Sequence, residues 1–235
     1  MLKVSKMDSG KPEIFRSIQG EGANMGEISV FMRLSMCNLS CTWCDTPYTW
    51  DWRNHDFHNE VMEISIPQAE KLILEFKTSH LVITGGEPLL QQNELTNLSA
   101  ALKQREFFIE IETNGTIVPS IEALESISQW NVSLKTNNSG NKVDKRQNSD
   151  ALKVFRELNN CYFKFVVVNP EDIEEICRIV DQLHFNPRNV ILMPEGLNSA
   201  TINKRSEWVA EACIDYGFNF STRLHILLWD NVRGK

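Results

Sequence analysis

The residues whose types and spacing point most directly to chemistry are three cysteines near the N-terminus. Cys37, Cys41 and Cys44 follow one another at the spacing C-x3-C-x2-C. Thiolates this close can face one metal centre, and soft sulfur ligands suit zinc or an iron–sulfur cluster. Three thiolates on a cluster of four irons would keep one iron open for a small molecule. A zinc ion would instead need a fourth ligand, for which His55 or His58 is available.

The composition limits the class of protein. A chain of 235 residues can bury a sizeable core as one large domain or two small ones. The net charge of −7 argues against a nucleic-acid partner, which would select a basic surface. No apolar run is long enough to span a membrane, and the N-terminus lacks the apolar region of a signal peptide. We therefore expect a cytoplasmic protein with reduced thiols, which disfavours disulfides, and with no nucleic-acid or membrane partner.

Short β-type runs alternate with longer helical runs along the chain. We expect strands at 28–34, 81–84, 107–112, 132–135, 162–168 and 190–193. We expect helices at 67–78, 89–105, 119–128, 149–158, 170–183 and 201–216. Six βα units in a row predict an α/β fold with a parallel sheet, but they are too few for a closed eightfold barrel. No G-x-G-x-x-G follows the first strand, and we therefore expect a partial (β/α)6 barrel rather than a dinucleotide-binding sheet.

Polar or glycine-rich loops follow five of the predicted strands. Besides the cysteine loop, they are G-G-E-P at 85–88, T-N-G at 113–115, S-L-K at 133–135 and P-E-G at 194–196. Because active sites of parallel α/β folds form at the C-terminal ends of the strands, we expect these loops to converge there. Two further segments, 54–60 and 137–148, are polar and have no apolar period, and we expect mobile stretches, the second a solvated surface loop.

The cysteine spacing, with Trp43 just before the last cysteine, resembles that of the radical S-adenosylmethionine (SAM) enzymes. The neighbouring motifs E-I-F-R-S-I-Q-G-E-G at 13–22, F-M-R at 31–33 and C-D-T-P-Y-T-W at 44–50 resemble the 7-carboxy-7-deazaguanine synthase family. The likeness extends to R-L-H-I-L-L-W at 223–229. It implies a single radical SAM domain over residues 1–235, with a core at about 13–229.

The resemblance implies a reaction and its cofactors. The expected enzyme is a carbon–nitrogen lyase that converts 6-carboxy-5,6,7,8-tetrahydropterin to 7-carboxy-7-deazaguanine and ammonia by radical-mediated ring contraction. This step belongs to 7-deazapurine biosynthesis, which includes the queuosine pathway of tRNA modification. The implied cofactors are a [4Fe–4S] cluster, SAM and Mg²⁺. An electron donor such as flavodoxin or ferredoxin and a homodimeric state are also implied.

Two alternatives remain open from the residues alone. A radical SAM activase of a glycyl-radical protein would share the cysteine spacing, but it would not need Q-G-E-G or C-D-T. A zinc-stabilised binding module would have no enzymatic activity. The first alternative predicts a protein substrate, whereas the second predicts bound zinc and no iron.

The resemblance also implies roles for individual residues, with no catalytic group beyond the cluster and SAM. The cluster ligands are Cys37, Cys41 and Cys44, and Thr46 is the Mg²⁺ ligand. The implied SAM contacts are Trp43, Cys44, Asp45, Gly86, Glu87, Ser133, Leu134, Lys135, Met193, Pro194, Glu195 and Gly196. The implied substrate contacts are Ile18, Gln19, Gly20, Glu21, Arg33, Thr84 and His225. Amide and carboxylate groups can hydrogen-bond the edge of a pterin, and a guanidinium can hold its carboxylate through two hydrogen bonds.

Several of these residues also have plainer structural explanations. G-G-E-P is a possible strand-to-helix turn, and D-T-P is a possible capped turn. A lone histidine such as His225 in an apolar run is more often a hydrogen-bonded core residue than a ligand. The family more often has proline where Leu134 stands. The remaining cysteines, at 161, 177 and 213, are isolated, and we expect buried apolar thiols there.

Overall fold

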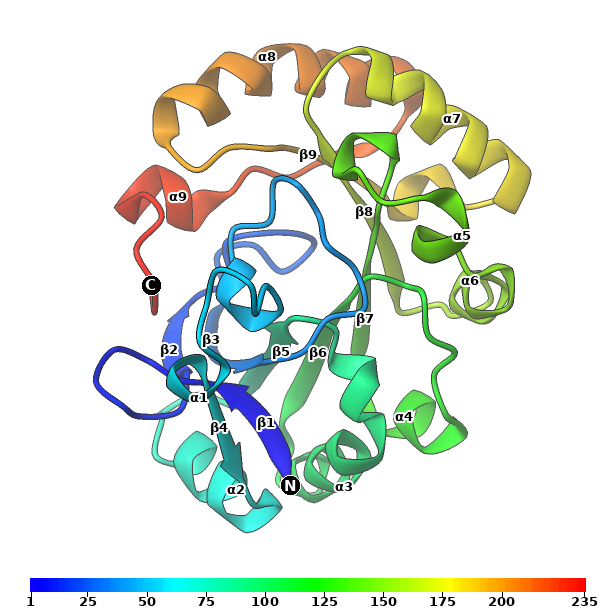
Figure 1. The fold of residues 1–235 in the computed structure, drawn as a ribbon. Helices are drawn as coiled ribbons and strands as arrows, with labels where there is room; N and C mark the ends of the chain where they lie inside the picture. The colour runs from blue at the N-terminus through cyan, green and yellow to red at the C-terminus, as the bar shows by residue number, and fades with distance from the viewer.

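Ten strands form one sheet in the computed structural model, which describes residues 1–235 (Figure 1). The strands are β1 (Leu2–Ser5), β2 (Ile14–Ile18), β3 (Ile28–Leu34), β4 (Val61–Ile64), β5 (His80–Gly85), β6 (Phe108–Thr113), β7 (Gln129–Leu134), β8 (Cys161–Val167), β9 (Val190–Pro194) and β10 (Asn219–Phe220). Their order is β10-β9-β8-β7-β6-β5-β3-β1-β4, and β2 pairs with β3. All pairs from β3 to β10 are parallel, whereas β1, β2 and β4 pair antiparallel.

Nine α-helices accompany the strands, and those of the βα units cover the outside of the curved sheet. They are α1 (Phe57–Glu60), α2 (Ile66–Leu74), α3 (Gln92–Lys103), α4 (Ile121–Ser126), α5 (Val143–Arg146), α6 (Ser149–Arg156), α7 (Glu171–Leu183), α8 (Ser199–Tyr216) and α9 (Leu224–Trp229). Four 3₁₀ turns are η1 (Pro47–Thr49), η2 (Pro88–Gln91), η3 (Asn137–Ser139) and η4 (Pro187–Asn189). In Figure 1 the helices from α2 to α8 follow an outer arc, and the lighter blue segment between β3 and β4 lies inside it. No helix, not even the 18-residue α8, has an apolar stretch that could cross a membrane.

The six predicted βα units are confirmed. Their strands are β3, β5, β6, β7, β8 and β9, and their helices are α2, α3 with η2, α4, α6, α7 and α8. The sheet remains open because its end strands, β10 and β4, do not pair with each other. The sequence did not predict β1, β2, β4 and β10, which are short strands of two to five residues. Segments of this length carry too little hydrophobic periodicity to be recognised without their partners.

The two faces of the central strands differ in character because successive side chains of a strand point to opposite faces. The outward residues form part of a core of 38 buried residues against the helices. In β6, β7 and β8 these outward residues are Ile109, Ile111, Trp130, Val132, Leu134, Cys161, Phe163, Phe165 and Val167. The alternate positions carry polar groups, among them Glu112, Ser133 and Lys164, and these line a cavity. The sheet thus buries one apolar face and presents a polar inner face.

Local sequence sets several helix boundaries. Ser65 begins α2 with a capping box, because its hydroxyl accepts from the Gln68 backbone and the Gln68 side chain accepts from the Ser65 N–H. Asn198 begins α8 by accepting from the Thr201 N–H at 2.9 Å. Gly217 ends that helix in the left-handed region, with φ of 70°, where glycine carries no steric penalty. The helices therefore begin and end where the chain itself supplies the capping groups.

The polar segment 137–148 is only partly the solvated loop that its composition predicts, because residues 142–145 are exposed but others are not. It forms η3 and α5, and the side chain of Arg146 is only 3% exposed. The Arg146 guanidinium donates to the Lys135 carbonyl at 2.7 Å and pairs with Glu175 at 2.8 Å. The prediction was wrong for Asn138, Asn141 and Arg146, because these side chains bond groups of other segments rather than water. The other polar stretch, 54–60, contains α1, which Asp56 caps by accepting from the Asn59 N–H at 3.0 Å.

The isolated cysteines differ in burial. Cys161 and Cys213 are buried in the core, as expected. Cys177 lies on α7 and is only partly buried, so the expectation of a buried thiol was wrong there. An amphipathic helix exposes the residues that border its apolar face, and Cys177 occupies such a position next to Ile176, which is fully buried.

Candidate active site

One cavity brings together most of the residues that the sequence singles out. It is lined by 31 residues and lies at the C-terminal ends of the parallel strands, where Thr84, Thr113 and Met193 are the last or next-to-last residues of β5, β6 and β9. The predicted residues that line it are Ile18, Gln19, Gly20, Glu21, Arg33, Cys37, Cys41, Trp43, Cys44, Asp45, Thr46, Thr84, Gly86, Ser133, Lys135, Met193, Glu195 and His225. Four predicted residues do not line it: Glu87, Leu134, Pro194 and Gly196.

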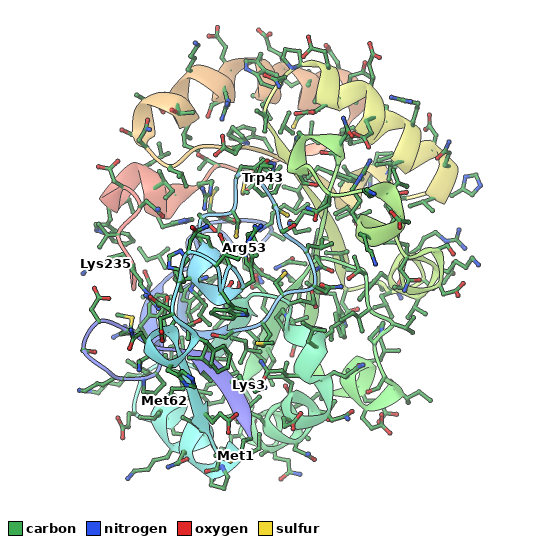
Figure 2. The ribbon with its side chains drawn as sticks, viewed as in Figure 1. Met1, Lys3, Trp43, Arg53, Met62 and Lys235 are labelled. Atoms are coloured by element: carbon green, nitrogen blue, oxygen red, sulfur yellow. The ribbon has the colours of Figure 1, made fainter.

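The cysteine loop follows β3 and lines the cavity with its three cysteines. Figure 2 labels Trp43 on this loop, within the arc of helices. All three cysteines are free thiols and partly exposed. Burial raises the pKa of Cys37 to about 12 and also raises the pKa of Cys41. Without a metal these two thiols are protonated near neutral pH, so metal binding must release protons.

The donor set fits an iron–sulfur cluster better than a zinc ion. Nowhere in the structure do three His, Cys, Asp or Glu side chains converge as they would around a single metal ion. His55 packs edge-on against Tyr48, and His58 packs edge-on against Phe57. Neither histidine lines the cavity. The two histidines that the sequence offers as a fourth zinc ligand are therefore outside the cavity, and the three cysteine sulfurs suit a cluster that binds a small molecule at its remaining iron.

The two glycines of G-G-E-P allow the backbone at the end of β5 to pack closely against the start of the cysteine loop. A Cβ atom on Gly85, whose φ is 120°, would lie 2.1 Å from the Leu34 carbonyl oxygen. A Cβ atom on Gly86 would lie 2.0 Å from the Met36 carbonyl oxygen. These distances are shorter than any real contact, so only glycine permits this backbone packing. Gly86 also donates to the Leu34 carbonyl at 2.9 Å, which fixes the cysteine loop against the strand end.

Glu87 supports the cavity wall from behind. Its side chain is fully buried, and its carboxylate accepts from the Thr113 hydroxyl at 2.7 Å and from the Asn114 N–H at 2.6 Å. Burial raises the pKa of this carboxyl, although the backbone donors Asn114 and Leu89 act against the shift. The hydrogen bonds hold the T-N-G turn after β6 against the turn after β5.

The other three residues outside the cavity have simple structural reasons. Leu134 belongs to the apolar core, because its neighbours Ser133 and Lys135 take the inner face of the chain at the end of β7. Pro194 is buried at the end of β9. Gly196 presents its carbonyl oxygen to Arg223, which donates to it at 2.7 Å.

Arg33 reaches the cavity with part of its guanidinium unpaired. Its Nε donates to Glu13 at 2.7 Å, and Glu13 also accepts from the Tyr48 hydroxyl at 3.2 Å. The two terminal nitrogens of Arg33 make no hydrogen bond within the protein. They form the edge of the guanidinium that matches a carboxylate through two parallel hydrogen bonds.

Arg223 connects three of the motifs. Its guanidinium pairs with Asp45 of the C-D-T motif, with Glu21 of the Q-G-E-G motif at 3.0 Å, and with the Gly196 carbonyl. Burial alone would raise the pKa of Asp45 and of Glu21. The nearby positive charges together outweigh burial, chiefly Arg223 with Arg33 at Asp45 and Lys164 with Arg223 at Glu21, so the pKa values of both carboxyls are lowered. Both carboxylates are therefore ionised at neutral pH.

Lys164 lies on β8 between two carboxylates. Its ammonium pairs with Glu21 and lies 3.5 Å from Glu112, and its side chain is 3% exposed. Burial lowers the pKa of the lysine, but the attraction of Glu112 and Glu21 outweighs burial and raises it. Burial raises the pKa of Glu112, and Lys164 acts against that shift. The lysine is thus a fixed positive charge at the floor of the cavity.

A buried network orients Gln19. Its carboxamide donates to Glu110 at 2.6 Å, and its oxygen accepts from the Glu21 N–H at 3.3 Å. Glu110 is fully buried on β6 and also accepts from Asn24 at 2.8 Å and His80 at 3.0 Å. The hydrogen bonds therefore fix the positions of the oxygen and the NH₂ group of the Gln19 amide, and its side chain cannot rotate freely.

His225 lies at the start of α9 and closes the cavity beside the Q-G-E-G turn. A Cβ atom on Gly20 would lie 2.1 Å from its Nδ1, so this histidine requires glycine opposite it. Its Nε2 is 4.0 Å from the Glu21 carboxylate. Burial lowers the pKa of His225, although Glu21 acts against the shift, so the ring is neutral near pH 7.

Comparisons with known proteins agree with this geometry. Residues 33–192 match the Radical SAM superfamily. A 7-carboxy-7-deazaguanine synthase from Pyrobaculum aerophilum is 35% identical over 95% of this chain and 96% of its own length. A second, from Hyperthermus butylicus, is 32% identical over 92% of this chain and 91% of its own length.

The chain belongs to the 7-carboxy-7-deazaguanine synthase family.

The fold of this synthase family member is also that of a solved relative. The crystal structure of QueE from Escherichia coli has a TM-score of 0.71 and 26% identity, and the match covers 95% of this chain and 94% of QueE. The SuiB structure from Streptococcus suis with bound S-adenosylmethionine has a TM-score of 0.54 at 18% identity, and its likeness concerns the fold alone. Radical SAM enzymes use a [4Fe–4S] cluster and SAM, and the three cysteines in the cavity are the donor set that fits this cluster.

Sequence reasoning missed several charged residues of this synthase site. Glu112, Lys164 and Arg223 line the cavity, and so does Lys235 at the end of the sequence. Figure 2 labels Lys235 near the C-terminal end of the ribbon. One signal was available: Glu112 and Lys164 are charged residues within strands whose neighbours are buried and apolar. Charged groups are seldom placed in such strands unless a polar cavity faces them.

Proposed function

We propose that this protein converts 6-carboxy-5,6,7,8-tetrahydropterin to 7-carboxy-7-deazaguanine and ammonia, as a radical SAM lyase of 7-deazapurine biosynthesis. One observation carries this proposal: a single cavity faces both the three free cysteines and the unpaired edge of the Arg33 guanidinium. When bound, the cluster and SAM supply a 5′-deoxyadenosyl radical. The residues of the chain then have to bind the pterin, orient it and keep water away.

We assign the carboxylate of the substrate to Arg33. Glu13 is fully buried and holds Nε of this arginine, so the two terminal nitrogens have a fixed direction. Bidentate binding of a carboxylate adds geometric specificity to the charge attraction. Gln19, oriented by Glu110, and neutral His225 offer polar atoms to the pterin edge. The other proposed substrate contacts are Ile18, Gly20, Glu21 and Thr84.

We assign SAM to the part of the cavity next to the cysteines. The proposed contacts that line the cavity are Trp43, Cys44, Asp45, Gly86, Ser133, Lys135, Met193 and Glu195. Lys135 lies over the Trp43 ring at 5.3 Å and donates to the Ser133 hydroxyl at 2.7 Å. A cation and a hydroxyl side by side suit the carboxylate of an amino-acid cofactor. Glu87, Leu134, Pro194 and Gly196 support this region from behind.

We assign Mg²⁺ to Thr46. Its hydroxyl lies in the cavity, 3.7 Å from the Cys44 sulfur. The neighbouring carboxylate of Asp45 is already paired with Arg223, so it is less available to a cation. A single hydroxyl ligand is consistent with Mg²⁺, which keeps several waters and shares substrate oxygens as ligands.

We propose that residues 1–235 act as one domain, form a homodimer and receive electrons from a reduced flavodoxin or ferredoxin in the cytoplasm. The family resemblance supports these assignments, and so does the need of the cysteine triad for a reducing compartment. Light scattering of the purified protein tests the dimer, because a monomeric mass at micromolar concentration would exclude it.

The test of function is turnover by the reconstituted protein. The protein is loaded anaerobically with iron and sulfide and is given SAM, dithionite, Mg²⁺ and 6-carboxytetrahydropterin. We expect 7-carboxy-7-deazaguanine by mass spectrometry, with SAM recovered after turnover. Cys41→Ser should abolish the product, whereas the matched control Cys177→Ser, a cysteine on α7 outside the cavity, should retain it.

Other outcomes separate the alternatives. A protein that cleaves SAM to 5′-deoxyadenosine and leaves the pterin intact would overturn the substrate assignment and favour the glycyl-radical activase. Turnover of the pterin without a protein partner would exclude that activase. A colourless protein with one bound zinc and no iron would overturn the enzymatic proposal altogether.

A further inference from the structure

Two sulfurs of the cysteine triad accept a hydrogen bond from a side-chain N–H in this structure. Cys41 accepts from the side-chain amide of Asn141 at 3.3 Å. Cys44 accepts from the indole N–H of Trp50, also at 3.3 Å. The two side-chain donors come from different segments, one after β7 and one at the end of η1.

The amide of Asn141 is oriented by its other contacts. Its oxygen accepts from the Ser40 N–H at 3.0 Å, within the cysteine loop itself. Because a backbone N–H can bond only to the oxygen of the amide, the NH₂ group must face the Cys41 sulfur. The Ser139 hydroxyl lies 3.3 Å from the same NH₂ group. These contacts therefore fix the NH₂ group of Asn141 as the donor to the Cys41 sulfur.

The segment that carries Asn141 is itself fixed to the cysteine loop. The Thr42 N–H donates to the Ser139 carbonyl at 3.0 Å, and the Trp43 indole donates to Asn138 at 3.1 Å. A Cβ atom on Gly140, whose φ is 75°, would lie 2.7 Å from the Thr42 methyl group. These contacts fix the position of the Asn141 side chain relative to the Cys41 sulfur.

We propose that Asn141 and Trp50 raise the reduction potential of the bound cluster through N–H···S hydrogen bonds to Cys41 and Cys44. Hydrogen bonds to cluster sulfurs are one of the main determinants of its potential. The added electron makes the cluster more negative, so each N–H dipole stabilises the reduced form more than the oxidised form. Both residues act through the cysteines and are tuning residues rather than catalytic ones. The inference rests on the proposed function only in requiring that the cluster is bound.

Trp50→Phe is the sharper test, because phenylalanine keeps a six-membered aromatic ring and loses the pyrrole part of the indole with its N–H donor, a loss of ring volume that the control shares. The matched control is Trp52→Phe. Trp52 packs edge-on against Phe57 at 5.1 Å, its indole N–H makes no hydrogen bond, and it does not line the cavity. The readout is the midpoint potential of the reconstituted cluster, from an anaerobic redox titration followed by electron paramagnetic resonance.

We expect a more negative potential in Trp50→Phe and no change in Trp52→Phe. At the midpoint potential of the wild-type protein, the ratio of reduced to oxidised cluster should fall at least threefold. A threefold change corresponds to about 28 mV, because a one-electron couple changes tenfold in about 59 mV. An unchanged potential in Trp50→Phe, with a full iron content, would overturn the role of Trp50.

Asn141→Ala tests the second donor, with Asn137→Ala as its control. Asn137 is exposed on the same segment, and its side chain makes no hydrogen bond. We expect a more negative potential for Asn141→Ala alone and a larger shift when it is combined with Trp50→Phe. If the single variant has the wild-type potential at full iron content, Asn141 has no tuning role.

The test distinguishes this inference from the proposed function. A wild-type protein that forms no cluster contradicts both. A cluster whose potential is insensitive to both substitutions contradicts the tuning inference, while product formation would still support the proposed function. Asn141→Asp is a further check on the sign, because it replaces the donor by a negative charge and should lower the potential more than alanine does.

Discussion

At the scale of single residues, Glu21 holds the polar groups of the cavity together. Its carboxylate pairs with Lys164 and with Arg223, and its side chain is only 13% exposed. Removing this charge would take one carboxylate partner from each of these two buried cations, which would keep only Glu112 and Asp45. Breaking a buried ion pair from one side typically costs about 3 kcal/mol or more.

We expect Glu21→Gln to lower the free energy of unfolding by about 3 kcal/mol at pH 7. The pKa of Glu21 is lowered from 4.5 in the folded protein, so its contribution is fully present above pH 4.5. It is lost as the pH falls through the lower folded-state value. The difference in free energy of unfolding between the wild-type protein and the variant should therefore be smaller below pH 4.5. Urea unfolding at pH 7 and pH 4 measures this difference. A deficit that is independent of pH would contradict this account, and exposed Glu125→Gln is the control.

Arg33 offers a second prediction at this scale. Arg33→Lys keeps the positive charge and loses both the planar edge and the hydrogen bond from Nε to Glu13. A hydrogen bond to a charged group contributes about 1.5 to 3 kcal/mol, so KM for the pterin should rise about tenfold to a hundredfold. Steady-state kinetics measure this rise. Arg16→Lys, on the exposed face of β2, should leave KM unchanged, and a normal KM in Arg33→Lys would exclude Arg33 as the carboxylate ligand.

At the scale of elements, alternation along the strands separates core from site. Glu110 and Glu112 lie two residues apart on β6 and so share the inner face, whereas Ile109 and Ile111 share the outer face. The same alternation places Lys164 of β8 beside Glu112. A charged residue at one of these inner positions is thus compatible with a fully apolar core one residue away.

The segment from 136 to 148 acts as a single cover over the cysteine loop. Arg146 fixes it, because its guanidinium bonds the Lys135 carbonyl and Glu175. We expect Arg146→Met to lower the free energy of unfolding by about 3 kcal/mol, since Glu175 loses its buried partner. The freed segment should also retain less iron after reconstitution and desalting.

Urea unfolding and iron analysis measure the two effects of this substitution. Lys145→Met, at an exposed position of the same helix α5, is the control and should change neither. Normal iron retention in a destabilised Arg146→Met would show that this segment stabilises the fold without protecting the cluster.

At the scale of the whole molecule, the C-terminal residues lie beside the cavity and contact segments from the N-terminal part of the chain. Arg233 bonds Glu13 at 2.9 Å, Glu60 at 3.1 Å and the Lys6 carbonyl at 2.7 Å. Its guanidinium also lies 3.7 Å from the centre of the Tyr48 ring. Glu13 in turn holds Arg33, so the C-terminal residues are connected to the proposed substrate site.

We expect Arg233→Ala to lower the free energy of unfolding by about 2 kcal/mol, through the lost cation–π contact and charged hydrogen bonds. It should also raise KM for the pterin, because Glu13 loses one of the groups that fix it. Thermal unfolding and steady-state kinetics measure these effects. Arg53→Ala, whose side chain is 87% exposed, is the control. An unchanged KM would show that the contact between Arg233 and Glu13 does not affect substrate binding.

The sequence by itself determined the features that depend on neighbouring residues. The six βα units follow from local hydrophobic periodicity, and the cysteine loop and the motifs at the strand ends are continuous segments. Because parallel strands bring their C-terminal ends together, most predicted site residues share one cavity. These conclusions needed no knowledge of which side chains meet across the fold.

Only the tertiary structure decided which distant residues meet. Arg223 reaches Asp45 across 178 positions of sequence, and Arg233 reaches Glu13 across 220. The polar segment that carries Asn141 has the composition of a surface loop, yet it donates to Cys41, 100 positions away. No local pattern encodes such contacts. The sequence of a polar segment is the same whether its side chains hydrogen-bond to water or to buried groups of the protein.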